Sequence, residues 1–273
     1  MTAEFHGAAA TVYELASYPI KGLSPQTVAS VALKTGRGFP YDREWALARP
    51  GGEYRPGNGK AIHKSNFFVL LKEDRLAGIT TNLDVHSRVL EVKVRQHVVL
   101  HEDLATRAGV RAVERFFARI LDCPDEAEPI LAREPGRRFT DAAIKSDTLM
   151  NAVSIINLDS IRDLSRRSER VIDHRRFRAN IYIQGTPPFA EAELVGKEFS
   201  IGDVLLRGLA AIPRCAATEV NPSTAVRDLA VPRLLVEHYG DANLGIWAEV
   251  INGATMRQGD PVKVNPYAGN GEA

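Results

Sequence analysis

The sequence predicts a mainly β protein with a few α-helical elements, arranged as a β-barrel or sandwich and not as an alternating α/β sheet. Three observations carry this fold class. Short β-prone runs fill residues 11–100, turn-forming glycine, proline and asparagine separate these runs, and helical spacing of apolar residues is confined to a few later segments such as 104–121. Many short strands at close spacing are typical of barrels and sandwiches.

The strands expected in the first hundred residues are brief, and turn segments such as 56–59 interrupt them. A helix is expected over 104–121, because apolar residues recur there at helical spacing between arginines. Residues 122–138 contain three prolines and several acids, which is typical of a linker, so a domain boundary is expected there. The expected strands cover residues 12–15, 28–33, 45–47, 67–71, 79–81 and 90–94.

After this linker, an apolar run at 150–156 precedes a helix for which Asn157 is the expected N-cap. A second helix is expected over 231–239, since proline is tolerated in a first turn and Gly240 suits a C-cap. The remaining β segments are expected at 180–183, in a hairpin region at 194–209, and at 244–251 and 262–264.

These elements divide the chain into two domains. We expect an N-terminal β-rich domain over residues 10–125, a second β domain with helices over 126–267, and a loose tail at 268–273. The chain has 273 residues, which is enough for two modest domains with a substantial core.

Composition excludes several classes of function. Lysine and arginine number 35 against 34 acidic residues, which argues against a general nucleic-acid binder but leaves room for a local basic pocket. The two cysteines form no Cys-x-x-Cys pair, and this fits a reducing compartment. The first ten residues do not resemble a signal peptide, and no run reaches the ~18 apolar residues of a membrane span. We therefore expect a cytoplasmic, soluble protein with no membrane partner.

Cys215 is the strongest single candidate for chemistry. It follows Arg214 and precedes Thr218 by three residues, between an apolar, strand-like run at 206–212 and a turn that begins at Asn221. The thiol is therefore expected where a strand runs out into a loop, a common position for functional side chains. The neighbouring cation would favour the thiolate. The alternative, a small buried hydrophobic residue, stays open on residue type alone.

Basic residues form the second set of candidates. Arg178 directly precedes an expected strand and alternates with Asn180, and a guanidinium beside a buried strand needs an anionic partner, either a phosphate or carboxylate ligand or a structural carboxylate. The other arginines of the tract 166–176 are expected to be solvated. Lys21 lies in a turn, and Arg43 lies between two acids, so a solvated lysine and a surface ion network are the simplest interpretations.

The sequence lacks the common cofactor and catalytic motifs. It contains no Gly-x-Gly-x-x-Gly, no Walker loop, no His-Glu-x-x-His and no Gly-x-Ser-x-Gly. The common cofactor folds are therefore unsupported, and pyridoxal phosphate binding is not expected.

Several short motifs nevertheless occur in one order along the chain. They are a Pro-Ile-Lys turn, an Asp-Arg pair before a strand, Arg-Arg-Phe-Arg-x-Asn-Ile, Arg-Cys-x-x-Thr-x-Val-x-Pro and a late Gly-Asp-x-Val. This set resembles the MOSC-domain family in which a MOSC N-terminal β-barrel domain comes first, a family that includes the mitochondrial amidoxime-reducing component and related bacterial proteins. The resemblance covers residues 12–264. It implies a MOSC-type β-barrel preceded by the N-terminal β-rich domain.

The resemblance also implies a molybdenum cofactor and an oxidoreductase function. In such a protein Cys215 would ligate molybdenum and act as the catalytic residue, and a soft thiolate suits this metal. A small N-hydroxylated or similar N-oxygenated substrate would be reduced with electrons from a separate partner protein. The positions that would contact the cofactor are Lys21, Arg43, Arg178, Asn180, Arg214 and Thr218.

The sequence departs from the family pattern near both arginine motifs. Ala179 stands where relatives often have proline, and Glu219, Asn221 and Ala225 replace a threonine, an aspartate and a glycine. Losing the aspartate removes a negative charge near the expected metal, so substrate range or proton delivery would differ. Two other functions stay open: a carrier of the cofactor or of sulfur without turnover of its own, and a non-catalytic β-barrel binding module with a structural cysteine.

Overall fold

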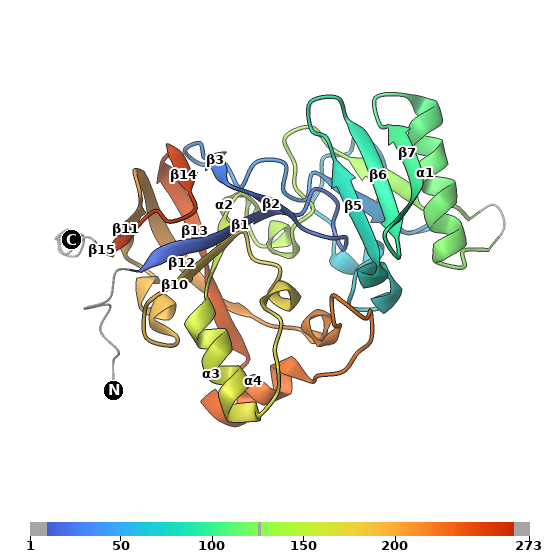
Figure 1. The fold of residues 1–273 in the computed structure, drawn as a ribbon. Coiled ribbons are helices and arrows are strands. Elements are labelled where there is room, and N and C mark those ends of the chain that lie inside the picture. The colour runs from blue at the N-terminus through green and yellow to red at the C-terminus, as the bar shows by residue number, and fades with distance from the viewer. Residues whose placement is uncertain (1–9, 125–126, 265–273) are drawn as a thin grey trace.

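The structure is a computed structural model that describes residues 10–124 and 127–264. It has two lobes, which lie side by side in Figure 1. We call residues 10–32 and 140–264 the barrel lobe and residues 45–133 the small lobe. The expected tail at 268–273 lies outside the described residues.

One curled eight-stranded sheet organises the barrel lobe. Neighbouring strands within this sheet pair antiparallel, except that β9 and β10 pair parallel. The strand order is β15 (Val262–Val264), β11 (Glu198–Ile201), β12 (Val204–Pro213), β13 (Asn243–Asn252), β9 (Val153–Asn157), β10 (Ile181–Gln184), β1 (Thr11–Ser17) and β2 (Gln26–Val28).

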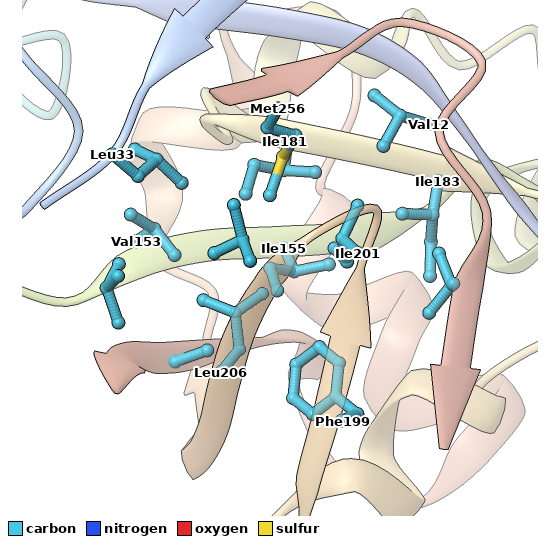
Figure 2. Packing of buried hydrophobic residues seen from close by; sticks show 14 of the residues in the cluster. Val12, Leu33, Val153, Ile155, Ile181, Ile183, Phe199, Ile201, Leu206 and Met256 are labelled. Carbon is cyan, nitrogen blue, oxygen red and sulfur yellow. The ribbon is translucent and has the colours of Figure 1, made fainter. Parts of the chain in front are cut away.

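The sheet curls until its two ends approach each other. Thr11 of β1 forms a bridge with Pro261, just before β15. β3 (Ser30–Ala32) pairs with β14 (Thr255–Arg257) beside this junction. Apolar side chains such as Val153, Ile155 and Leu206 point toward one another inside the curl, as Figure 2 shows. This interior is the main hydrophobic core.

Two helices cover the outer face of the same sheet. They are α3 (Leu158–Ser168) and α4 (Val231–Tyr239), at the bottom of Figure 1. Successive residues of a strand face opposite sides, so Ile155 enters the inner core while Ile156 packs under the helices. The expected caps are confirmed, because the Asn157 side chain accepts a hydrogen bond from Asp159 N and Gly240 ends α4.

The small lobe has its own core. β5 (Ile79–Leu83), β6 (Val89–Val94) and β7 (His97–Asp103) form an antiparallel sheet, and β4 (Trp45–Ala48) pairs with β8 (Ile130–Arg133). The expected helix is α1 (Arg107–Ile120), whose Val113, Phe116 and Phe117 are buried. Short elements complete the fold: α2 (Asp147–Met150), η1 (Lys64–Asn66), η2 (Asp74–Gly78), η3 (Asp141–Ile144), η4 (His174–Phe177), η5 (Ala190–Leu194) and η6 (Ala216–Glu219).

The mainly β fold class is confirmed, but three expected segments are wrong in detail. The linker 122–138 contains β8, which is a strand because it pairs with β4 over four register positions. Residues 67–71 form a loop in which Phe67 to Leu70 are buried and Leu71 is half-buried, and the loop makes an isolated bridge between Phe67 and Ala48 instead of a strand. The run 28–33 breaks at Ala29, where the chain leaves the large sheet and starts the pair with β14.

The division at residues 125 and 126 stays a prediction. The structure adds that β1 and β2, which precede the small lobe in sequence, are strands of the large sheet. Within residues 10–124 and 127–264, none of the helices combines the length and apolar character that crossing a lipid bilayer requires.

Candidate functional site

A cavity of about 370 Å³ lies where the two lobes meet. The small lobe contributes η1 and the loop after it, and the barrel lobe contributes the ends of several strands. Seven basic and two acidic side chains line the cavity, although the whole chain carries a formal charge of only +1. The basic side chains are Lys21, Arg43, Lys64, Lys145, Arg176, Arg178 and Arg214, and the acids are Asp42 and Asp141.

Cys215 lies directly after β12, at the start of η6. It is half-buried, and its side chain is a free thiol. The carbonyl oxygen of Cys215 accepts hydrogen bonds from the backbone N–H and the hydroxyl of Thr218, at 3.0 and 2.9 Å. Thr218 therefore fixes the turn that presents the sulfur, which confirms the expected strand-to-loop position.

Arg214 holds this turn against the barrel lobe. Its guanidinium donates to the carbonyl oxygens of Leu244 and Phe177, the latter at 3.0 Å. Gly245 leaves room for this arrangement, because a Cβ there would lie 3.0 Å from Arg214 Nη2 and 2.6 Å from Ile155 O. Burial lowers the pKa of Arg214 to about 10, so the group remains a cation at neutral pH. Its donors are used mainly by the backbone.

Lys64 and Asp141 bring two further charges to the thiol. The Nζ atom of Lys64 lies 3.9 Å from Cys215 Sγ and 3.2 Å from a carboxylate oxygen of Asp141. Asp141 also accepts from Lys21, whose Nζ donates to Phe139 O at 2.8 Å. Burial raises the pKa of Asp141, but the charges of Lys21 and Lys64 outweigh burial and hold it below its usual value. The carboxylate therefore stays ionised between two lysines.

Arg43 and Arg178 meet at another part of the cavity lining. Arg43 donates to Asp42 and, at 3.0 Å, to the carbonyl oxygen of Arg178. Both arginines adopt left-handed backbone conformations, with φ of 51° and 55°. Both guanidinium groups lie over the ring of Tyr18. Asp42 is buried, so the simple surface ion network expected around Arg43 is wrong.

The guanidinium of Arg178 lines the cavity and is the best candidate for binding an anion there. Its Nη2 atom is buried and has no hydrogen-bond partner within residues 10–124 and 127–264. In the same described part of the chain, the hydroxyl of Thr140, which also lines the cavity, lacks a partner. Buried polar groups are rarely left unpaired, because desolvation without a hydrogen bond costs about 1–3 kcal/mol. An oxyanion in the cavity would satisfy such donors.

Asn180 lines the cavity but is occupied by the sheet. Its side-chain oxygen accepts from the backbone N–H and the hydroxyl of Ser154, at 3.1 and 2.9 Å. Its amide nitrogen donates to Ala16 O at 3.2 Å. Asn180 thus ties β9 and β1 together at the cavity floor.

All seven residues singled out from the sequence line this one cavity. Four charged residues that line the cavity were missed: Lys64, Asp141, Lys145 and Arg176. Arg176 was expected to be solvated with its tract, but it is 4 % exposed and pairs with Asp228 at 2.6 Å. Arg176 could not be recognised as buried because it lies among several arginines of the same tract. No sequence pattern distinguished Lys64 from a surface lysine.

The departures from the family pattern have visible local effects. The backbone N–H of Ala179, which a proline would lack, donates to the hydroxyl of Tyr182 at 3.1 Å. Asn221 donates to Asp228 at 2.7 Å. Ala225 has a φ of 58°, a left-handed conformation that favours glycine.

The fold and the cavity together define a two-lobed β protein with one thiol in a cation-lined cavity. Comparison with known families agrees: residues 9–134 match the MOSC N-terminal beta barrel domain, and residues 140–263 match the MOSC domain. The chain belongs to the family of proteins in which these two domains follow one another.

Similar proteins span most of the chain. Mitochondrial amidoxime-reducing component 1 of Mus musculus is 32% identical, covering 92% of this chain and 81% of its own. Mitochondrial amidoxime reducing component 2 of Bos taurus is 24% identical, covering 92% of this chain and 82% of its own. Molybdenum cofactor sulfurase of Drosophila mojavensis is 27% identical over 78% of this chain and 28% of its own. The YUAD protein of Bacillus subtilis aligns over 94% of this chain and 97% of that structure, with 13% identity and a TM-score of 0.43.

Proposed function

We propose that the cavity binds the molybdenum cofactor and that Cys215 ligates its metal. The observation that carries this proposal is the combination of a half-buried thiol with a cationic cavity in which a buried arginine donor, Arg178 Nη2, has no partner among the described residues. A soft thiolate suits molybdenum, and basic side chains suit the cofactor's phosphate. The residues present therefore fit this group.

The side chains divide the work of binding. Lys21, Arg43 and Arg178 would hold the anionic end of the cofactor through charge-assisted hydrogen bonds. Arg214 and Thr218 would hold the loop that carries the ligating sulfur, and Asn180 would keep the floor of the cavity in register. When bound, the cofactor supplies two-electron oxygen-atom transfer, and the protein orients it and shapes its surroundings.

The reaction we propose is the reduction of a small N-hydroxylated or similar N-oxygenated substrate. Two electrons and two protons cleave the N–O bond and release the oxygen as water, and the electrons come from a separate protein. The amidoxime-reducing components, similar over 92% of the chain, support this reaction class.

The test begins with protein purified from a host that makes the cofactor. We expect about one molybdenum and one pterin per chain, and reduction of benzamidoxime with a reduced artificial dye. Cys215→Ala should abolish turnover. Cys123→Ala should not, because Cys123 packs against the core of the small lobe. A chain that contains neither molybdenum nor pterin would contradict the proposal.

A second function is favoured by the similarity to a molybdenum cofactor sulfurase. A carrier of the cofactor or of sulfur would hold molybdenum and pterin yet show no turnover with any donor. A non-catalytic binding module would instead keep its ligand content unchanged in Cys215→Ser and Arg178→Ala. The same measurements therefore separate all three functions.

A further inference from the structure

Tyr18 lies behind the cavity and contacts two of its cations. Its side chain is fully buried, and it is not among the residues that line the cavity. The guanidinium carbon of Arg178 lies 4.3 Å from the centre of the Tyr18 ring, and that of Arg43 lies 4.8 Å from it. One aromatic ring therefore supports both arginines that meet beside Lys21.

Hydrogen bonds that involve the backbone hold Tyr18, Arg43 and Arg178 together. Tyr18 N donates to the Asp42 carboxylate at 2.9 Å, and Arg43 N donates to Tyr18 O at 2.8 Å. Arg43 Nη2 then donates to Arg178 O at 3.0 Å. Residues far apart in sequence are thus assembled into one rigid unit, with the ring at its centre.

The guanidinium groups of Arg43 and Arg178 are like charges that lie close together, so the chemical nature of the side chain that contacts them both matters. A carboxylate would hold both guanidinium groups but would also neutralise them. An aromatic ring attracts cations through its quadrupole and carries no net charge. Asp42 offsets one cation of the pair, so one positive charge remains for an anion in the cavity.

We propose that Tyr18 is a positioning residue that aims Arg43 and Arg178 at an oxyanion in the cavity without neutralising them. Identifying this anion as the phosphate of the cofactor rests on the proposed function. The orienting role of Tyr18 does not, because it applies to any tetrahedral oxyanion.

The experiment measures inorganic phosphate binding by calorimetry, with chain purified from a host that cannot make the cofactor. Tyr18→Phe keeps the ring and should bind within twofold of the unaltered chain. Tyr18→Leu removes the ring and should bind at least tenfold more weakly. Tyr54→Leu is the matched control, because Tyr54 is another buried tyrosine, packed in the small lobe's separate cluster, and should leave phosphate binding unchanged.

A graded series keeps the test independent of folding. Phenylalanine analogues with one, two and three ring fluorines, placed at position 18, retain the ring shape while the cation–π attraction declines. Phosphate affinity should fall stepwise along the series while the melting temperature stays level. Equal affinities along the series, equal losses in the position-18 and Tyr54→Leu variants, or no phosphate binding by the unaltered chain would each overturn the proposal. Absence of molybdenum from protein made in a cofactor-competent host would overturn the proposed function alone.

Discussion

The Nζ atom of Lys64 lies 3.9 Å from the sulfur of Cys215, and the two residues are 151 positions apart in the chain. Lys64 belongs to the small lobe and Cys215 to the barrel lobe. The environment of the thiol is therefore set by the packing of one lobe on the other.

Replacing Lys64 with methionine should weaken anion binding in the cavity. The change removes one of the seven basic side chains that line the cavity. The negative charge of Asp141, now shared by Lys21 and Lys64, would then offset the positive charge of Lys21 only. One partly exposed charge is worth on the order of 1 kcal/mol, which corresponds to about fivefold in phosphate affinity. Calorimetric titration with phosphate checks this, with Lys64→Arg expected to retain affinity. Lys60→Met, an exposed lysine four residues earlier, should match the unaltered chain.

Asn180→Ala should destabilise the fold more than it perturbs ligand binding directly. The substitution leaves the hydroxyl and N–H of Ser154 and the carbonyl of Ala16 without their partner. We expect a loss of roughly 2–4 kcal/mol in the free energy of unfolding, measured with urea. Asn82→Ala, at an exposed position, should change stability by less than about 0.5 kcal/mol. Native stability combined with lost cofactor would show instead that the Asn180 amide serves the ligand.

Arg227→Met should loosen the loop that carries the thiol. Arg227 donates to Ala216 O at 2.8 Å and to Leu70 O and Leu71 O, so it joins the Cys215 loop to the small lobe. We expect unfolding free energy to fall by about 1–3 kcal/mol and amide exchange at residues 216–220 to accelerate. Arg233→Met, on the exposed side of α4, is the control. Unchanged exchange in the loop would argue against this connection between the lobes.

Glu191→Gln should alter how stability depends on pH. Glu191 is 1 % exposed and accepts from the Ser160 hydroxyl at 3.0 and 2.9 Å, and burial raises the pKa of its carboxyl from 4.5 to about 7. The folded state therefore binds this proton more tightly than the unfolded state. The resulting stabilisation is complete below pH 4.5 and is lost as the pH rises through 7.

The difference in unfolding free energy between Glu191→Gln and the unaltered chain should shift by about 2 kcal/mol from pH 5 to pH 8, in favour of the variant at the higher pH. Urea denaturation at the two pH values measures it. Ala192→Gln, at an exposed position of the same turn, changes no titratable group and should give curves parallel to those of the unaltered chain. Parallel curves for Glu191→Gln would show that its carboxyl titrates normally.

The sequence predicted those parts of the fold that local pattern determines. α1 and α4 follow from apolar spacing and end residues, and the caps at Asn157 and Gly240 follow from side-chain and backbone preferences. β8 was missed because four residues between prolines become a strand only through the partner β4. β7 was missed because most of its side chains are exposed, so no buried face marks it.

The same distinction applies to the candidate site. Cys215 stood out because cysteine is scarce in the chain and because its neighbours match a family motif. Lys64 lies in a glycine-rich polar stretch, and only the packing of the lobes brings it to the thiol. Arg176 is buried whereas the adjacent Arg175 is exposed, and the residues around them give no pattern that predicts this difference.

The place of β1 in the large sheet has a consequence for how the chain comes to be folded. Thr11 pairs with Gln184, so the first strand is made long before its partner leaves the ribosome. At roughly 5–20 residues per second, it waits on the order of ten seconds or longer. Non-local pairing of this kind slows folding. The cavity is lined by Lys21, which is synthesised early, and by Cys215, which is synthesised after β10. It is therefore among the last features of the nascent protein to form.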